Sequence, residues 1–178
     1  MTSPRAYGSG LIRASWYDFP QYYDLAFRCE TRPEADFIEA ACHKYCDFPV
    51  RRLLEPACGS GRLVVEMALR GYRVTGLDLS RTALDYVRSK LKRRGLRARL
   101  LRADMADIRL PCRFDAAYNT FDSFRHLLDQ RQARSHLKCV ADCLRPGGIY
   151  ILGFHLLPPD ASPNCIERWT ERRGRLQV

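Results

Sequence analysis

The feature that most constrains the fold of this chain is a regular alternation of short apolar segments with segments of helical periodicity. Strand-like segments are predicted at residues 51–56, 72–77, 97–103, 114–118 and 149–154. Apolar residues at helical spacing fill the intervals after the first, second and fourth of these segments. Parallel strands need such crossover connections, so the pattern predicts an α/β fold, a doubly wound and mainly parallel sheet with helices on both faces.

The 178 residues are predicted to form a single domain, since this length buries a sizeable core without disulfides or metals. Residues 1–48 read as an N-terminal arm, rich in aromatics, and a first helix. Thr31 and Glu34 have the spacing of a capping box for that helix, with Pro33 in its first turn. Residues 49–155 are predicted to form the ligand-binding core, and residues 156–178 a C-terminal tail.

Basic residues outnumber acidic residues by 30 to 20, which gives a formal net charge of +10. An excess of this size attracts anions such as nucleic acids or phosphorylated substrates. Several basic residues gather around the end of the helix that precedes Gly95, namely Arg88, Lys90, Lys92, Arg93, Arg94, Arg97 and Arg99. This cluster is either an RNA-binding surface or the solvated end of a helix, where cations interact favourably with the helix dipole.

The eight cysteines include no Cys-x-x-Cys pair, and the N-terminus lacks the apolar segment of a signal peptide. These features predict reduced thiols in a cytoplasmic protein. The pairs Cys42/Cys46 and Cys139/Cys143 have helical spacing, with histidines nearby, and four such ligands on two helices could hold zinc. We expect core packing and no metal site, because cysteine is a common small core residue. We find no segment that is apolar and long enough to cross a membrane.

The first predicted strand runs into a turn of small residues, Cys58-Gly59-Ser60-Gly61, before a helix. Small residues allow a ligand to approach the backbone closely, and the N–H groups at the start of the helix attract an anion. A dinucleotide fingerprint would require a glycine at Val64, and no Walker A sequence is present. The turn therefore favours a ligand without a pyrophosphate.

Acidic residues follow the next two predicted strands. Asp78 lies seventeen residues after Gly61, where a carboxylate accepts both hydroxyls of a ribose. Asp104 follows the third strand and can accept an exocyclic amine, while the apolar neighbour Met105 packs on a purine. Parallel strands end at the same edge of a sheet, so these groups together indicate a nucleoside site.

These segments resemble the motifs of class I S-adenosylmethionine-dependent methyltransferases, over roughly residues 15–155, and the resemblance implies a Rossmann-like fold. Glu55-Pro-Ala-Cys-Gly-Ser-Gly61 resembles the first motif, although Ala57 stands where a glycine is usual. The other matching segments are Thr75-Gly-Leu-Asp78-Leu-Ser, Ala103-Asp104-Met105, Phe114-Asp-Ala-Ala-Tyr-Asn119 and Leu144-Arg-Pro-Gly-Gly148. Five motifs in order, with the right spacing, make the resemblance specific.

The resemblance implies S-adenosyl-L-methionine as cofactor. The turn at 58–61 would hold the methionine moiety, Asp78 the ribose, and Asp104 with Met105 the adenine. Asn119 and Phe121 would lie beneath the sulfonium. The full set of expected cofactor-binding residues is Tyr23, Glu55, Ala57, Cys58, Gly59, Gly61, Asp78, Leu79, Asp104, Met105 and Asn119.

Methyl transfer from a sulfonium is an in-line displacement that depends mainly on proximity and alignment. A base helps where the acceptor must lose a proton, and the candidates are Asp122, His126 and His155, which follow the fourth strand or end the fifth. Tyr17, Tyr22 and Tyr23 are candidates for a lid that offers cation–π contact to the sulfonium, or for packing on the first helix.

Three functions fit these observations. The leading hypothesis is a methyltransferase acting on a small molecule, because residues 119–124 lack the Asn/Asp-Pro-Pro-Tyr/Phe signature of enzymes that methylate exocyclic nitrogens of bases or glutamine. The alternatives are an RNA methyltransferase that uses the basic helix end, and a cofactor-binding subunit without turnover.

Class I methyltransferases have seven strands, and only five are predicted before residue 155. We therefore expect incomplete C-terminal strands and a truncated form of a longer sequence. An uncovered parallel edge invites pairing with another chain, so a homodimer through that edge is the corresponding expectation, with reduced stability or activity as the other outcome.

Overall fold

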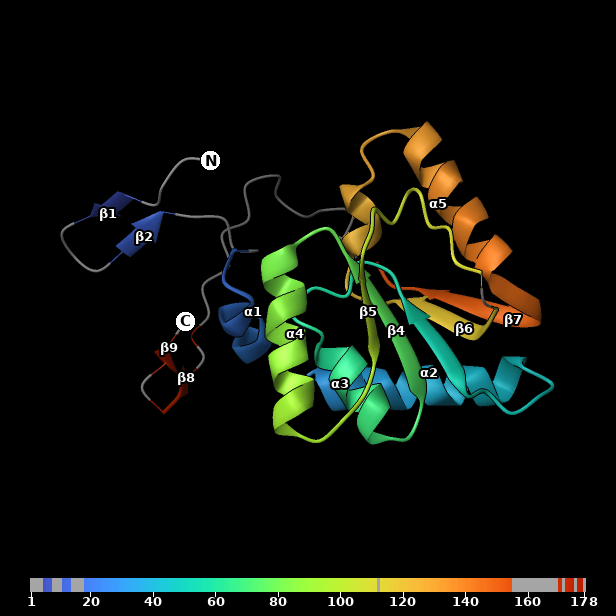
Figure 1. The fold of residues 1–178 in the computed structure, drawn as a ribbon, viewed down its shortest axis with the longest axis horizontal. Helices are drawn as coiled ribbons and strands as arrows, with labels where there is room; N and C mark the ends of the chain where they lie inside the picture. The colour runs from blue at the N-terminus through green and yellow to red at the C-terminus, as the bar shows by residue number, and fades with distance from the viewer. Residues whose placement is uncertain are drawn as a thin grey trace, which may run out of the picture.

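The computed structural model describes residues 5–7, 11–13, 18–111, 113–154, 170, 172–174 and 176–177. Its centre is a parallel sheet with the strand order β5-β4-β3-β6-β7 (Figure 1). The strands are β3 (Arg52–Glu55), β4 (Arg73–Asp78), β5 (Arg99–Arg102), β6 (Phe114–Asn119) and β7 (Leu144–Leu152). The strand order reverses between β3 and β6, so the sheet is doubly wound, and the predicted fold class is confirmed.

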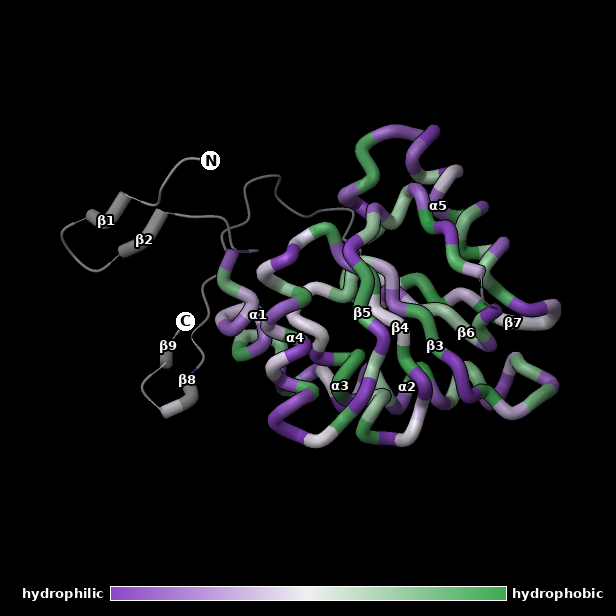
Figure 2. Tube along the Cα trace, in the orientation of Figure 1, coloured by the Kyte–Doolittle hydropathy of each residue, from purple (hydrophilic) through white to green (hydrophobic). Residues whose placement is uncertain are grey.

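Helices cover both faces of the sheet (Figure 1). They are α1 (Pro20–Ala26), α2 (Thr31–Tyr45), α3 (Arg62–Leu69), α4 (Arg81–Arg93) and α5 (Gln130–Cys143), with a short 3₁₀ helix, η2 (Ser123–His126). Apolar residues of α2, α3 and α4 pack on one face around Leu53 and Val74, whereas α5 packs on the other around Leu54 and Ala117. The two central strands, β3 and β6, are buried along nearly their whole length. Figure 2 shows how hydrophobic and hydrophilic residues are distributed along the chain.

The connection from β5 to β6 contains no helix in its described residues, 103–111 and 113. On the face that carries α5, the loop residues Ile108 and Leu110 pack with Leu77 of β4 and Leu101 of β5. At the carboxyl ends of the strands the loop brings Asp104 and Met105 over the sheet edge. A hollow lies at the amino ends of β3, β4 and β5.

Two local predictions are wrong. Thr31 does not cap α2, because the N-cap is Glu30 and the Thr31 hydroxyl donates to the carbonyl of Phe27 at 3.3 Å. The Glu34 carboxylate forms an ion pair with the buried Arg62. The fifth strand also begins earlier than predicted, at Leu144, because the Pro146-Gly147-Gly148 segment is accommodated as an irregularity within β7. The partners of Phe114 and Ala116 on β7 are Leu144 and Ile149, so the extra residues bulge out.

Two hairpins lie outside the central sheet, β1 (Arg5–Tyr7) with β2 (Leu11–Arg13), and β8 (Arg172–Arg173) with β9 (Leu176–Gln177). Trp16, Tyr17, His155 and most of the expected tail lie outside the described residues. Within the described part, no helix has the length and apolarity needed to cross a membrane. The six cysteines described there are free thiols.

Candidate functional site

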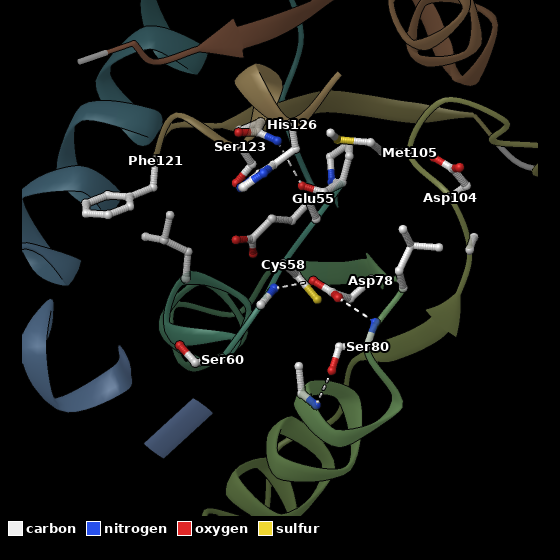
Figure 3. Close-up of a pocket in the computed structure, with 18 of the residues that line it drawn as sticks. Glu55, Cys58, Ser60, Asp78, Ser80, Asp104, Met105, Phe121, Ser123 and His126 are labelled. Carbon is white, nitrogen blue, oxygen red and sulfur yellow. Dashed lines mark hydrogen bonds between the residues drawn. The ribbon is translucent and has the colours of Figure 1, made fainter. Parts of the chain in front are cut away.

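A cavity of about 500 Å³ opens at the carboxyl ends of β3, β4, β5 and β6, where the strand order reverses. Open α/β sheets bind ligands at this position. Figure 3 shows the lining side chains, which come from the turns that follow these strands. Of the expected cofactor-binding residues, Tyr23, Glu55, Ala57, Cys58, Gly59, Asp78, Leu79, Asp104, Met105 and Asn119 line the cavity.

The glycine turn between β3 and α3 uses the left-handed region three times, at Ala57 (φ 53°), Gly59 (φ 51°) and Gly61 (φ 64°). A Cβ on Gly59 would meet no atom within 4 Å and would enter open space beside the cavity. A Cβ on Gly61 would lie 2.4 Å from Val87 Cγ2 on α4. Gly59 therefore keeps the cavity open, whereas Gly61 does not line it and instead permits α3 to pack against α4.

Asp78 joins this turn to the next one along the sheet. Its Oδ2 accepts the N–H of Gly59 at 2.7 Å, and its Oδ1 accepts the N–H of Ser80 at 2.8 Å (Figure 3). The Ser80 hydroxyl in turn accepts the N–H of Ala83 and caps α4. A carboxylate has about four lone-pair sites, so Asp78 keeps acceptor capacity for two ligand hydroxyls after making both backbone bonds.

The loop after β5 is held from beneath by His136 on α5. The His136 ring is fully buried, with Nδ1 2.8 Å from the carbonyl of Met105 and Nε2 2.7 Å from the Tyr150 hydroxyl. Burial lowers the pKa of His136, which keeps the ring neutral and allows Nδ1–H to donate to Met105. The Asp104 side chain accepts the N–H of Ala106, and Met105 presents an apolar surface to the cavity.

Glu55 and Asn119 end the two central strands at the floor of the cavity. Burial raises the pKa of Glu55 to about 8, although the nearby Arg62 and the Tyr118 hydroxyl, which donates to Glu55 Oε2 at 3.1 Å, act in the opposite direction. Asn119 donates from Nδ2 to the carbonyl of Pro56 at 3.1 Å, while its Oδ1 is buried without a hydrogen-bond partner. The floor thus holds one unfilled acceptor and one carboxyl group that a bound cation would ionise.

Arg62 is a lining residue that the sequence analysis missed. Its guanidinium is buried, pairs with Glu34 on α2 at 2.6 Å and lies 4.7 Å from the centre of the Phe121 ring. The second Glu34 oxygen accepts the hydroxyl of Thr120 at 2.7 Å. The position of Arg62 directly after the glycine turn could have indicated that it lines the cavity. The contact between Glu34 and a loop 86 residues away depends on the tertiary structure and has no local sequence pattern.

Helix α1 closes one side of the cavity with Pro20 and Tyr23. The Tyr23 ring lies 5.9 Å from Phe121 and 4.7 Å from Phe27, measured between ring centres. The helix is anchored on α4, because Asp24 accepts hydrogen bonds from the buried Lys90 ammonium and, at 3.1 Å, from the Tyr86 hydroxyl.

The three candidate bases are separated by the structure. His126 lines the cavity and lies with Ser123 above Glu55 in Figure 3. Asp122 does not line it: it adopts a left-handed conformation (φ 57°) and pairs with Arg125 at 3.1 Å. His155 lies outside the described residues. Ser123 and Gln132 also line the cavity and were not singled out from the sequence.

The basic cluster at the end of α4 lies on the side of the sheet where the strands begin, whereas the cavity lies where they end. The helix has 13 residues, so its ends are about 20 Å apart. Lys90 must be removed from this cluster, because it points inward to Asp24 and to the carbonyl of Ser60. Elsewhere in the part of the chain that is described, no group of three or more His, Cys, Asp or Glu side chains is placed to hold a metal ion.

Comparisons with known proteins agree with this geometry. The family model of the methyltransferase domain matches residues 53–148, more than half of the chain. A dTDP-3-amino-3,6-dideoxy-α-D-glucopyranose N,N-dimethyltransferase from Streptomyces fradiae is 31% identical over 71% of this chain and 48% of its own length. The chain belongs to the methyltransferase domain family, as the resemblance of its motifs to class I enzymes predicts.

Solved structures show the same architecture. An S-adenosylmethionine-dependent methyltransferase from Clostridium acetobutylicum has a TM-score of 0.69 and 25% identity, covering 77% of this chain and 56% of its own. CalS10, an amino pentose methyltransferase from Micromonospora echinaspora, has a TM-score of 0.70 and 27% identity, covering 85% and 64%. The chain spans about half the length of the curated relatives it matches.

Proposed function

We propose that this chain binds S-adenosyl-L-methionine in the cavity at the switch point and transfers its methyl group to a small-molecule acceptor. The observation that carries the proposal is the arrangement around Asp78, in which an open glycine turn and a carboxylate with spare acceptor sites lie side by side. A nucleoside without a pyrophosphate fits such a site.

The remaining lining residues fit the same cofactor. The unfilled Asn119 Oδ1 and the carboxyl of Glu55 would face the cationic amino acid end. Leu79 and Met105 supply an apolar surface for the purine, and Asp104 provides a carboxylate beside it. When bound, the cofactor supplies an electrophilic methyl group on a sulfonium. The chain's own residues bind and orient the reactants, which is the main source of rate in a displacement of this kind.

His126 is the proposed proton acceptor where the acceptor group must be deprotonated, because it lines the cavity and Asp122 does not. An amine acceptor is favoured by the relatives, whose names include two amino-sugar N,N-dimethyltransferases. The RNA alternative finds less support, because the basic cluster lies about 20 Å along α4 from the cavity.

Replacing Asp78 tests the cofactor site. We expect Asp78→Asn to weaken S-adenosylmethionine binding by about 2–3 kcal/mol, because charge-assisted bonds to the ribose are lost. Isothermal titration calorimetry measures this change. The matched control is Asp115→Asn. Asp115 Oδ2 also accepts two backbone N–H groups, those of Arg51 and Arg52, each at 2.8 Å. Asp115 lies near the amino end of β6, away from the cavity. Equal affinity in the two variants would contradict the assignment.

Replacing Gly59 tests whether the turn is a ligand surface. Gly59→Val places a branched side chain in open space beside the cavity, so we expect binding to be lost. Gly71 also has a positive φ (93°) and open space around it, away from the cavity. Gly71→Val therefore carries comparable backbone strain and should bind normally. If both variants fold and both bind, the turn has only a structural role.

Turnover distinguishes the enzyme from a binding subunit. Formation of S-adenosylhomocysteine is measured with a panel of small amines, small hydroxyl compounds and RNA. We expect product with a small amine and a loss of its rate in His126→Ala. Tight cofactor binding without product from any acceptor would favour the non-catalytic alternative.

A further inference from the structure

A second hollow, of about 320 Å³, lies at the amino ends of β3, β4 and β5. Four of its lining residues are arginines, Arg52, Arg73, Arg97 and Arg99, and none is acidic. The other lining residues are Tyr72, Val74, Thr75, Ala98 and Phe114. A surface of this composition attracts anions.

Strand register explains why the arginines gather. Arg52 on β3 pairs with Arg73 on β4, and Thr75 on β4 pairs with Arg99 on β5, so continuing the parallel register places Arg97 beside Arg73. Residues in register on neighbouring parallel strands point to the same face of a sheet. This is the α5 face, and among the described residues no helix covers its amino-end part.

Three of these four arginines have no acidic partner within the described part of the chain. Arg52, Arg73 and Arg97 form no ion pair with any residue described there, in contrast to Arg81 and Arg109, which pair with Asp85 and Asp107. Aligned like charges repel one another, so the arrangement costs stability unless an anion occupies it.

The positive surface extends beyond the hollow. Four more basic residues are exposed on this side of the sheet, where β3 begins and α4 ends: Arg51, Lys92, Arg93 and Arg94. A small phosphate would fill the hollow and leave these residues unused, whereas a polyanion would contact all of them. We propose that this edge binds the phosphodiester backbone of a nucleic acid, at a site separate from the methyl-transfer cavity.

Fluorescence anisotropy of a labelled single-stranded RNA at several salt concentrations tests the proposal. Arg73→Gln/Arg97→Gln should weaken binding roughly tenfold near 0.1 M salt, because two phosphate contacts are lost. The slope of log K against log salt should fall by about 1.4, since each contact on a single strand contributes about 0.7. S-adenosylmethionine affinity should not change, so this result is independent of the proposed enzymatic function.

The control is Arg81→Gln/Arg109→Gln, which removes the same net charge from two exposed arginines that have carboxylate partners. This variant should bind RNA as the parent does. An equal loss in both variants would reduce the effect to net charge and overturn the proposal. Absence of RNA binding, or binding of inorganic tripolyphosphate at the same arginines in its place, would overturn the nucleic-acid assignment.

Discussion

Glu55 is a carboxyl group in a position where a negative charge is costly. It lies 7% exposed at the end of β3, and burial raises its pKa to about 8 from the ordinary value of 4.5. The folded protein therefore keeps this proton over a pH range in which the unfolded chain has released it. The sign follows from linkage: the folded state binds more protons, so stability falls as pH rises from about 4.5 to about 8.

We predict that Glu55→Gln abolishes this dependence, because glutamine resembles the protonated acid. Relative to the variant, the parent protein should lose roughly 1 kcal/mol of unfolding free energy for each pH unit between about pH 5 and 8. Urea unfolding at several pH values measures the difference. Tyr118→Phe removes the hydroxyl that favours the ionised form, so the loss should begin at the same pH and continue to a higher pH. Parallel profiles for all three proteins would contradict the prediction.

The same proton links stability to the site. A bound cation favours ionised Glu55, so binding of S-adenosylmethionine near pH 7 should release protons. Calorimetry in buffers of different ionisation enthalpy should detect the release, and Glu55→Gln should lack it. No proton release from the parent protein would place the cationic end of the cofactor away from Glu55.

Among the elements, α1 is joined to α4 by a buried ion pair. Lys90 on α4 is 7% exposed, donates to Asp24 and reaches the carbonyl of Ser60 at 3.3 Å in the glycine turn. Removing one partner of a buried ion pair leaves an uncompensated charge. Lys90 thus connects α1 to the glycine turn that lines the cavity.

We predict that Lys90→Met lowers the free energy of unfolding by about 3 kcal/mol and increases hydrogen exchange in α1 before other helices. Arg88→Met is the matched control on the same helix, because Arg88 is exposed and pairs only with the exposed Asp85. Lys90→Met/Asp24→Leu should recover part of the loss. If Lys90→Met matches Arg88→Met, the anchoring role is wrong.

At the scale of the whole molecule, the sheet ends in strands that are unpaired on one side. In the described residues nothing pairs with the outer edges of β5 and β7. The N–H of Gly153 bonds to the carbonyl of Asn119 on β6, so the N–H of Leu152 points outward by the alternation of a strand. A second chain could extend the sheet along this edge of β7.

We expect the chain to dimerise through β7, with a mass that rises with concentration in light scattering. Leu152→Pro removes an outward donor but no bond to β6, and should give a monomer at all concentrations. A parent protein that remains monomeric over the same concentration range would exclude this edge as an interface.

Short-range patterns predicted the strands, the glycine turn and most lining residues, because each depends on neighbours within a few residues. Gly59, Asp78 and Asp104 each follow a strand, and parallel strands end at one edge. The prediction of a capping box at Thr31 is wrong because the Glu34 carboxylate pairs with the buried Arg62 and not with the N-terminus of its own helix. Lys90 was placed in the basic cluster at the helix end because its partner, Asp24, is 66 residues away in the sequence.

The sequence by itself therefore determined the order of strands and helices and the chemistry available at each strand end. Only the tertiary structure decided how those groups are used. It placed Gly59 at the cavity and Gly61 in helix packing, gave Asp78 two backbone bonds, and gathered four arginines at the amino ends of the strands. The physical reason is that burial, register and long-range pairing depend on which segments pack together, and no local pattern records that choice.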